Sequence, residues 1–376
     1  MLPRELREEH EKLLSPYACQ SVNSRGRLKP DEPCTVRTVF ERDAGRIIYS
    51  LEFRRLRHKT QVFFDPQNDH ICTRMEHVIQ VNYIANTIGR ALNLNGDLIE
   101  AIALGHDLGH APFGHTGEKT LHSCLNASVP DRIFEHERHG LRVIDQLARR
   151  HGKHQGLNLS FEVRDGITNH CGETYDEYVL VPDRDKPTDS LGSASAGTSM
   201  PATLEACVVR VADKIAYVGR DIEDAARAGI MEFGDIPPAI QTELGRTNGQ
   251  IINTLVTDII ENSHNQDAII LSRERGEMMR QLLDANVKRI YRSEKIKRYE
   301  TMVENVLEGL FEALMLALED RERLQSSTNR VYQGLLKFMT ERDYPTEEPN
   351  AQIVTDYIAG MTDTYATRCF EDLYWF

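Results

Sequence analysis

The sequence predicts an all-α fold, a bundle of helices with very little sheet. Apolar residues recur at helical spacing in the segments 77–91 and 136–150, so each segment has one face that a core would cover. A third helical pattern runs through 208–224, and several more helices, separated by charged breaks, follow from residue 237 to the end. Amphipathic helices along nearly the whole chain favour a helical bundle over a fold built on a sheet.

The first elements lie in the N-terminal third of the chain. Segments 60–64 and 70–73 flank the turn-forming residues 66–69, which predicts a small β-hairpin. Further along, Asp97 stands at the N-cap position of a helix, and Glu100 is placed as its capping-box partner. We therefore expect a hairpin first and a well-capped helix after it.

Two later segments complete the outline. Residues 136–150 are predicted to form one amphipathic helix, whose apolar face consists of Leu141, Ile144, Leu147 and Ala148. Segment 182–201 is rich in Ser, Gly, Pro and Asp, which is typical of a mobile surface loop between two core helices.

Composition limits the classes of function. A chain of 376 residues with 40% hydrophobic and 27% charged residues can bury a large core, as soluble globular proteins do. No apolar run reaches the roughly 18 residues that a transmembrane helix needs, and the first residues lack the apolar stretch of a secretory signal. The 7 cysteines are scattered without a CxxC pair, so we expect reduced thiols in a cytoplasmic protein.

The charge distribution argues against nucleic acid as the main ligand. The net charge is −13, which opposes binding to a phosphate backbone. The basic run 54–59 can still collect phosphates, although a solvated basic helix face is an equally good interpretation. Asp224 is expected to lie on the ordinary surface.

Most of the chemistry is concentrated in residues 106–118, with the sequence HDLGHAPFGHTGE. Adjacent His106 and Asp107 can both reach one metal ion when their backbone lies at a helix end. Imidazole and carboxylate ligands suit a borderline-to-hard divalent ion. The Gly and Pro residues that follow end the helix and return the chain, which would bring His115 and Glu118 close to whatever the metal holds.

Two more ligands come from other helices. His77 lies at the end of the apolar face of 77–91, and Asp213 is a lone acid inside an apolar helix. A buried carboxylate is costly without a partner, so it should be paired or bound to metal. Taken singly, His77 could be a core or surface histidine and the dipeptide His106-Asp107 could occur by chance. In this order, His77, His106, Asp107 and Asp213 make a four-ligand set.

The order His … His-Asp … Asp resembles the signature of the HD-domain metal-dependent phosphohydrolases. A longer series of motifs, from about residue 46 to residue 224, resembles the deoxynucleoside triphosphate (dNTP) triphosphohydrolases, which include the bacterial dGTPases. These motifs are, in order, RLR and KTQV (55–62), RMEH (74–77), HDLGHAPFGHTGE (106–118), FEHE (134–137), ADKIAY (212–217) and Asp221.

The resemblance implies an HD-domain helical bundle that hydrolyses dGTP or several dNTPs to a deoxynucleoside and inorganic triphosphate. It implies one divalent ion per active site, Mn, Mg or another transition metal such as Fe, Co, Ni or Zn. It also implies a homo-oligomer, a dimer or a hexamer, and leaves room for a nucleotide effector. Single-stranded DNA would have weak effects at most, and no membrane partner is expected.

On the same basis, the chain divides into three parts. Residues 1–45 form an N-terminal arm, residues 46–236 form the HD phosphohydrolase core, and residues 237–376 form a helical C-terminal region packed on that core.

Several residues are expected to bind the phosphates or move a proton. Lys214 follows the proposed ligand Asp213, and Arg74 lies one turn before His77. Both should therefore face the metal-bound phosphates, whose negative charge cations must offset. His110 and His136 could add imidazole donors there, or could be surface histidines. A separate pair, His115 and Glu118 at positions i and i+3, suits acid–base catalysis, which in the resembled family assists departure of the nucleoside 5′-oxygen.

Sugar recognition rests on the resemblance. Gln61 and Asp221 match residues that read the 3′-hydroxyl, and Tyr217 matches a tyrosine that closes over the sugar, although it could be a core aromatic. The chain has Arg220-Asp221 where the family usually has His-Asp, which leaves Arg220 with a phosphate or a structural contact. Some dGTPases carry Asn at the position of His110, so this histidine hints at broader specificity.

Two other functions fit part of the pattern. Another HD enzyme, such as a nucleotidase or phosphodiesterase, would share the four ligands but would not need the KTQV or HTGE segments. A non-catalytic nucleotide-binding sensor would keep the pocket, and the intact set of catalytic residue types argues against it.

Overall fold

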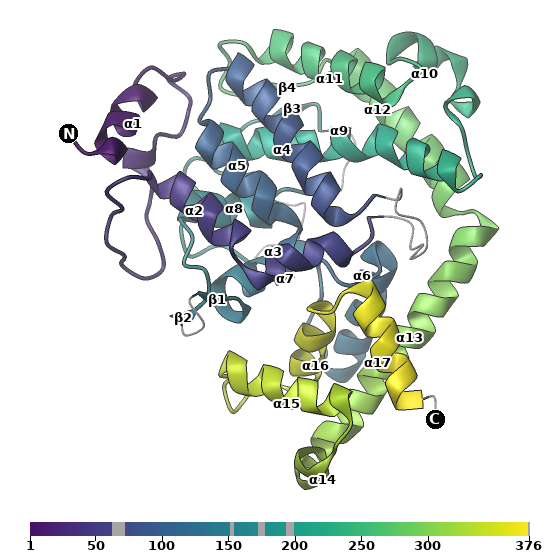
Figure 1. Cartoon of the computed structure of the whole chain (residues 1–376). Coiled ribbons are helices and arrows are strands. Elements are labelled where there is room, and N and C mark those ends of the chain that lie inside the picture. Colours follow the sequence, from purple (N-terminus) through teal and green to yellow (C-terminus); the bar gives the residue numbers. More distant parts are fainter. Residues whose placement is uncertain (62–71, 151–153, 172–176, 193–198, 375–376) are drawn as a thin grey trace.

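A computed structural model describes residues 1–61, 72–150, 154–171, 177–192 and 199–374. In this part of the chain the regular secondary structure is almost entirely helical, which confirms the all-α prediction (Figure 1). The α-helices up to the long central one are α1 (Pro3–Glu11), α2 (Val39–Ile48), α3 (Leu51–Arg55), α4 (Arg74–Ala91), α5 (Gly96–Gly105), α6 (Gly114–Ser128), α7 (His136–Arg142), α8 (Phe161–Thr168) and α9 (Leu204–Arg227). The later ones are α10 (Pro238–Glu243), α11 (Asn248–Ser263), α12 (Arg273–Asn286), α13 (Glu294–Glu319), α14 (Arg321–Ser326), α15 (Arg330–Arg342), α16 (Asn350–Ala359) and α17 (Asp363–Tyr374).

The β-strands of the described residues form two short antiparallel pairs. Strand β1 (Arg149–Arg150) pairs with β2 (His154–Gln155), and β3 (Val179–Leu180) pairs with β4 (Ile269–Ile270). The second pair ties the loop before α9 to the segment before α12. None of the described helices combines the length and the apolar character that crossing a membrane requires.

The helices pack around two hydrophobic cores. The first core joins α2, α4, α5, α8 and α9 with α10, α11 and α12, and it continues to Ile296 at the start of α13. The second core joins α6 with α13 and the helices that follow it. Figure 1 shows α13 passing from the first group of helices to the second. The domain boundaries drawn from the sequence stay a prediction, and the boundary at residue 45 falls inside α2.

The helix that leads to His106 begins two residues earlier than predicted. Asn95, and not Asp97, is the N-cap, because its side chain accepts hydrogen bonds from the backbone N–H of Asp97 at 3.1 Å and of Leu98 at 3.4 Å. The Asn95 amide is itself held by Glu11 at 3.1 Å. This tertiary contact fixes the cap at Asn95, so Glu100 lies inside the helix and not in a capping box.

The helix predicted over 136–150 ends early. Helix α7 stops at Arg142, the chain continues as a π-helical turn (Val143–Leu147), and β1 follows. The backbone N–H of Ala148 closes that turn on the carbonyl of Val143 at 2.8 Å. The next carbonyl, that of Ile144, accepts from Leu157 at 2.7 Å. The returning β-hairpin therefore competes for the backbone groups that a longer helix would use.

The predicted hairpin at 60–73 and the predicted loop at 182–201 lie partly outside the described residues. Residues 62–71 of the hairpin are not described, and in its described part an antiparallel bridge joins Thr60 to Thr73. Segment 182–201 contains no helix or strand where it is described. It is not wholly a surface loop, because Lys186 is buried and its ammonium donates to Asp165 at 2.7 Å. That buried ion pair fixes the loop against α8.

Candidate active site

A short turn after α5 carries the central histidine and aspartate. His106 to Gly109 form a 3₁₀ turn that ends α5. A side chain at Gly109 would collide with backbone, because an added Cβ would lie 1.9 Å from the carbonyl oxygen of His136. Glycine here lets α7 pack directly on the turn, which places His136 beside the residues that the turn presents.

His106 is prepared as a metal ligand. Its Nδ1 lies 2.7 Å from the carbonyl oxygen of Ala103, which can only accept, so Nδ1 carries the proton. The Nε2 atom then keeps its lone pair. It is buried and has no hydrogen-bond partner among the described residues. A buried acceptor in this state is what a bound cation would satisfy.

Three elements bring the four predicted ligands together: α4 supplies His77, the turn supplies His106 and Asp107, and α9 supplies Asp213. His77 Nε2 lies 2.9 Å from Asp213 Oδ1. His106 Nε2 lies 3.4 Å from Asp107 Oδ1 and 3.8 Å from Asp213 Oδ1. Ligand atoms about 2.0–2.2 Å from one ion lie about 3–3.5 Å from each other. His77, His106 and Asp213 place their ligand atoms within 4.8 Å of one another and form a group that could hold a metal ion, and Asp107 adjoins this group through His106.

Both acids of this cluster are carboxylates at neutral pH. Burial would raise the pKa of Asp213, but the hydrogen bond and charge of His77 lower it well below the usual range. Burial also opposes ionisation of Asp107, but the interaction with the His110 ring and the charge of Arg74 outweigh it, so the Asp107 pKa is lowered as well. The cluster thus offers negative charge to a cation.

Arg74 is the first residue of α4 and points at the turn. Its guanidinium donates to Asp107 Oδ2 at 3.1 Å, and its side chain is buried. It also lines the cavity around the cluster, as expected for a phosphate contact. Lys214 lines the same cavity, but its ammonium already lies 3.2 Å from Glu177.

His110 and His136 are buried, so the surface interpretation of both is wrong. Their rings stack with centroids 3.8 Å apart. Burial, together with the charges of Arg74 and His136, lowers the pKa of His110 well below its usual value. Burial would also lower the pKa of His136, but the nearby Glu118 and Glu137 carboxylates raise it well above 6.5. The stack therefore pairs a neutral ring with a cationic one.

The proposed acid–base pair is looser than its sequence spacing suggests. His115 Nδ1 lies 3.8 Å from Glu118 Oε2, beyond a hydrogen bond, and the His115 side chain is 79% exposed. Glu118 is instead held by His136, whose backbone N–H donates at 2.7 Å and whose Nδ1 lies at 3.1 Å. Glu118 thus positions His136 as well as facing His115.

Two cavities meet at the site. The first has a volume of about 300 Å³ and is lined by the ligand cluster and charged groups, namely Gln61, Arg74, His77, Asp107, His110, His115, Glu118, Glu135, His136, Glu137, His170, Cys171, Asp213, Lys214 and Tyr217. The second has a volume of about 330 Å³ and is lined by Gln61, Phe113, His115, Thr116, Tyr217, Asp221, Leu283, Asn286, Val287, Tyr291, Ile296, Tyr299 and Glu300. Gln61, His115 and Tyr217 line both cavities.

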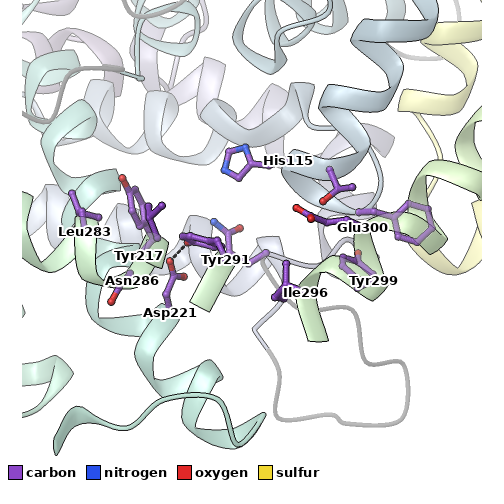
Figure 2. Close-up of a pocket in the computed structure, with 13 residues that line it drawn as sticks. His115, Tyr217, Asp221, Leu283, Asn286, Tyr291, Ile296, Tyr299 and Glu300 are labelled. Carbon is purple, nitrogen blue, oxygen red and sulfur yellow. Dashed lines mark hydrogen bonds between the residues drawn. The ribbon is translucent and has the colours of Figure 1, made fainter. Parts of the chain in front are cut away.

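The second cavity is formed between α9 and the segment from α12 to α13. Figure 2 shows Asp221 bonded to Tyr291, with His115 on the opposite side. Burial raises the pKa of Asp221 to about 7, although the Tyr291 hydroxyl donates to it. The side-chain oxygen of Gln61 is buried and has no partner among the described residues. Both residues thus present polar atoms to a ligand here.

Known families match this chain over most of its length. Residues 74–218 match the HD domain, and residues 269–372 match the phosphohydrolase-associated domain. A "deoxyguanosinetriphosphate triphosphohydrolase-like protein" of Caldanaerobacter subterraneus subsp. tengcongensis is 40% identical over 100% of this chain and 96% of its own. Proteins with the same description from Desulfatibacillum aliphaticivorans and Clostridium perfringens (strain 13) are each 37% identical, over 100% and 99% of this chain and 98% and 97% of theirs. The chain belongs to this family of HD-domain phosphohydrolases.

For three charged residues of this HD-domain phosphohydrolase, the structure corrects or completes the surroundings expected from the sequence. Asp224 is buried and accepts from Arg227 at 2.8 Å, so it is not an ordinary surface residue. Arg220 pairs with Glu223 at 3.1 Å, which makes its described contact structural. Lys59 is buried and donates to the carbonyl of Ala359 at 2.7 Å, so it is neither a solvated cation nor a phosphate clamp. Ion pairs within α9 decide the first two cases, and a contact between distant segments decides the third.

Sequence reasoning missed several residues of this phosphohydrolase site. His170 and Cys171 stand next to each other after α8, and this adjacency of two metal-binding residue types was the signal that could have found them. Asn286, Tyr291 and Tyr299 come from the C-terminal part of the chain, where no motif marks them.

Proposed function

We propose that this chain is a metal-dependent dNTP triphosphohydrolase, which converts a dNTP to a deoxynucleoside and inorganic triphosphate. The pair of adjoining cavities supports this proposal most strongly. One cavity contains the ligand cluster and cationic groups that a triphosphate needs, and the other contains tyrosines and a buried acid that suit a nucleoside. Gln61, His115 and Tyr217 stand between them, where the bond from phosphate to sugar would lie.

His77, His106, Asp107 and Asp213 would hold one divalent ion, Mn²⁺, Mg²⁺, Fe²⁺, Co²⁺, Ni²⁺ or Zn²⁺. Such an ion supplies a Lewis acid for a phosphoryl oxygen and an acidified water when bound. The protein adds fixed charge around the phosphates. Arg74 and the cationic His136 line the same cavity, with neutral His110 as a further donor. Lys214 lines it too and is also paired with Glu177.

His115 is suited to proton transfer at the border of the cavities. Water would add to the α-phosphorus while the bond from this phosphorus to the nucleoside 5′-oxygen breaks. His115 would give its proton to the departing 5′-oxygen and recover one from the incoming water, with Glu118 orienting its ring. The exposure of the ring allows it to turn toward the substrate.

The sugar would lie against the unpartnered oxygen of Gln61 and the buried carboxyl of Asp221. Tyr291 already occupies Asp221 Oδ2, which leaves the other oxygen to accept from a 3′-hydroxyl. Tyr217 would pack near C2′ and exclude ribose by contact. Recognition of this kind depends on the substrate hydroxyl, because the buried polar groups of the protein go unpaired without it.

This arrangement predicts that 2′,3′-dideoxynucleotides are poor substrates. We expect Gln61→Ala to weaken dNTP turnover while narrowing the gap in kcat/KM between deoxy and dideoxy substrates. Discrimination against ribonucleotides should relax less in this variant, because Tyr217 imposes it by packing. Steady-state rates with matched deoxy, dideoxy and ribo substrates measure all three effects. Equal turnover of deoxy and dideoxy substrates by the wild type would contradict the sugar assignment.

The reaction itself is tested by its products. Metal-loaded protein should convert dNTPs to deoxynucleoside and triphosphate, separated by ion exchange. In heavy-oxygen water the label should enter the triphosphate and leave the 5′-hydroxyl unlabelled, because water attacks phosphorus. Orthophosphate or pyrophosphate as the first product would instead indicate a nucleotidase or phosphodiesterase, and nucleotide binding without turnover would indicate a sensor.

The remaining proposals concern assembly and location. We propose a homo-oligomer, a dimer or a hexamer, that acts on dNTPs in the cytoplasm and has room for a nucleotide effector. Light scattering with and without each dNTP would give the mass of the assembly and reveal any change that an effector causes.

A further inference from the structure

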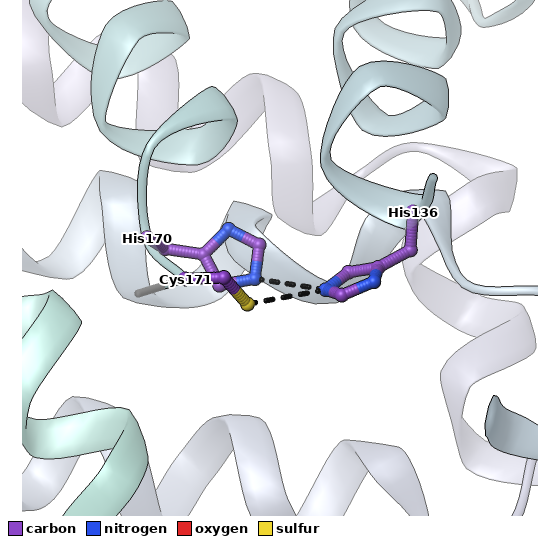
Figure 3. Close-up of side chains that lie close together, drawn as sticks. All are labelled: His136, His170 and Cys171. Atoms are coloured by element: carbon purple, nitrogen blue, oxygen red, sulfur yellow. Dashed lines mark hydrogen bonds between the residues drawn. The ribbon is translucent and has the colours of Figure 1, made fainter. Parts of the chain in front are cut away.

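A second group of side chains of metal-binding types lines the same cavity as His77, His106, Asp107 and Asp213, which are called the HD cluster below. His136 Nε2 is 3.3 Å from His170 Nε2 and 3.4 Å from Cys171 Sγ (Figure 3). The three potential ligand atoms all lie within 4.8 Å of one another. Figure 3 shows the two ring edges and the sulfur turned toward one point, with His136 reaching it from one side and His170 and Cys171 from the other.

The outer nitrogens of both rings are already engaged. His136 Nδ1 lies 3.1 Å from each oxygen of Glu118, whose pKa His136 holds well below the usual range although burial opposes ionisation. His170 Nδ1 lies 2.7 Å from the carbonyl oxygen of Ile167. Both acceptors need a proton from the ring, so both Nδ1 atoms carry hydrogen. Histidines that bind metal through Nε2 are usually oriented in this way by a carboxylate or carbonyl.

The inner Nε2 atoms of the two rings face each other across 3.3 Å. Because Nδ1 of each ring is directed outward to its own acceptor, a metal ion between the rings would take one lone pair from each Nε2. The Cys171 sulfur lies 3.4 Å from His136 Nε2 and offers a third ligand atom at the same point, which a proton shared by the two rings would not use.

We propose that His136, His170 and Cys171 form a second cation site, selective for a soft or borderline ion such as Zn²⁺ or Co²⁺. Two imidazoles and one thiolate are a ligand set that favours these ions over Mg²⁺ or Mn²⁺. The HD cluster contains no sulfur and offers two carboxylates, so it accepts harder ions. The two sites therefore divide the cavity between ions of different chemistry.

Binding exchanges protons for the metal ion. The Cys171 thiol, whose pKa burial raises, loses its proton to solvent when it binds the ion, and so does His136 Nε2. Affinity should therefore rise with pH. An ion on His136 also removes its cationic ring from the proposed phosphate contacts, so Zn²⁺ should inhibit a site that Mn²⁺ activates. The expected inhibition by Zn²⁺ rests on the proposed function, whereas metal binding at the second site does not depend on it.

Cobalt provides a direct test. Wild-type protein is first saturated with Mn²⁺ and then titrated with Co²⁺, while the near-ultraviolet band of cobalt–thiolate charge transfer is recorded. We expect one equivalent to produce this band, and to bind more tightly at higher pH. Cys171→Ser should remove the band and weaken binding by more than about tenfold, because ligand loss should exceed the effect of losing an outer partner. His170→Gln should weaken it similarly.

Cys124→Ser is the matched control, since Cys124 lies on α6 among the residues of the second core. It should keep the band at full strength. Absence of the band in the wild type at saturating Co²⁺, or its persistence in Cys171→Ser, would overturn the proposal. Circular dichroism identifies a variant that is unfolded, and the wild-type titration stays decisive in that case. A band without dNTP hydrolysis would leave this site intact and reject only the proposed function.

Discussion

Replacing His106 by alanine is expected to remove the bound divalent ion and hydrolysis together. The Nε2 atom of His106 is buried without a hydrogen-bond partner in the described part of the chain, so the variant deletes a ligand and leaves the charges of Asp107 and Asp213 unbalanced. A metal contributes several kcal/mol to stabilising a phosphoryl transition state. Turnover should therefore fall by about a thousandfold or more, at about 1.4 kcal/mol for each factor of ten.

Metal analysis and steady-state rates on the same preparation measure both effects. Asp107→Ala should behave alike, because the other half of the dipeptide is lost. His122→Ala is a suitable control, since His122 lies on α6 and its Nδ1 contacts the carbonyl of Phe134 at 3.2 Å, away from the ligands. Full metal occupancy with unchanged turnover in His106→Ala would contradict the ligand assignment.

Replacing His115 by alanine is expected to lower turnover by about two to four orders of magnitude, the usual contribution of a positioned proton-transfer group. Its side chain is 79% exposed, so metal binding and stability should change little. Glu118→Gln should act through two residues, because its carboxylate faces His115 and also holds His136. We therefore expect this second variant to lose substrate affinity as well as rate.

Rates, substrate affinity and metal content together separate these outcomes. His10→Ala changes another exposed histidine, on α1, and should leave all three unchanged. If His115→Ala keeps a normal rate with metal bound, the proton donor lies elsewhere, and the buried His110 and His136 are the next groups to test.

The sequence was sufficient for the parts of the site that local patterns encode. His77 is recognisable at the end of an apolar helix face and Asp213 as a lone acid inside an apolar helix. The 106–118 motif places its two ligands on one turn. The structure brings these residues together from three elements, as the pattern of helices requires. Whether they bind metal and act in catalysis stays a prediction that the variants above test.

The parts that sequence could not give depend on contacts between distant segments. The N-cap at Asn95 is fixed by Glu11, and the early end of α7 is fixed by a hairpin that returns to Ile144. The wall of the second cavity comes from residues 283–300, which carry no motif, because aromatic and amide side chains acquire a role only where α9 faces them. The hydrophobic periodicity of α9 and of residues 283–300 does not indicate that the two segments pack against each other.

Helix α9 sets a distance as well as supplying side chains. Asp213 lines the first cavity, Tyr217 lines both, and Asp221 lines the second, so successive turns of one helix pass from the ligand cluster to the cavity proposed for the nucleoside. At a rise of about 1.5 Å per residue, the two aspartates are separated by about 12 Å along the axis. The helix thus fixes the spacing between these two side chains. Because both aspartates lie on one helix, their spacing does not depend on the packing of α12 and α13, which supply other residues of the second cavity.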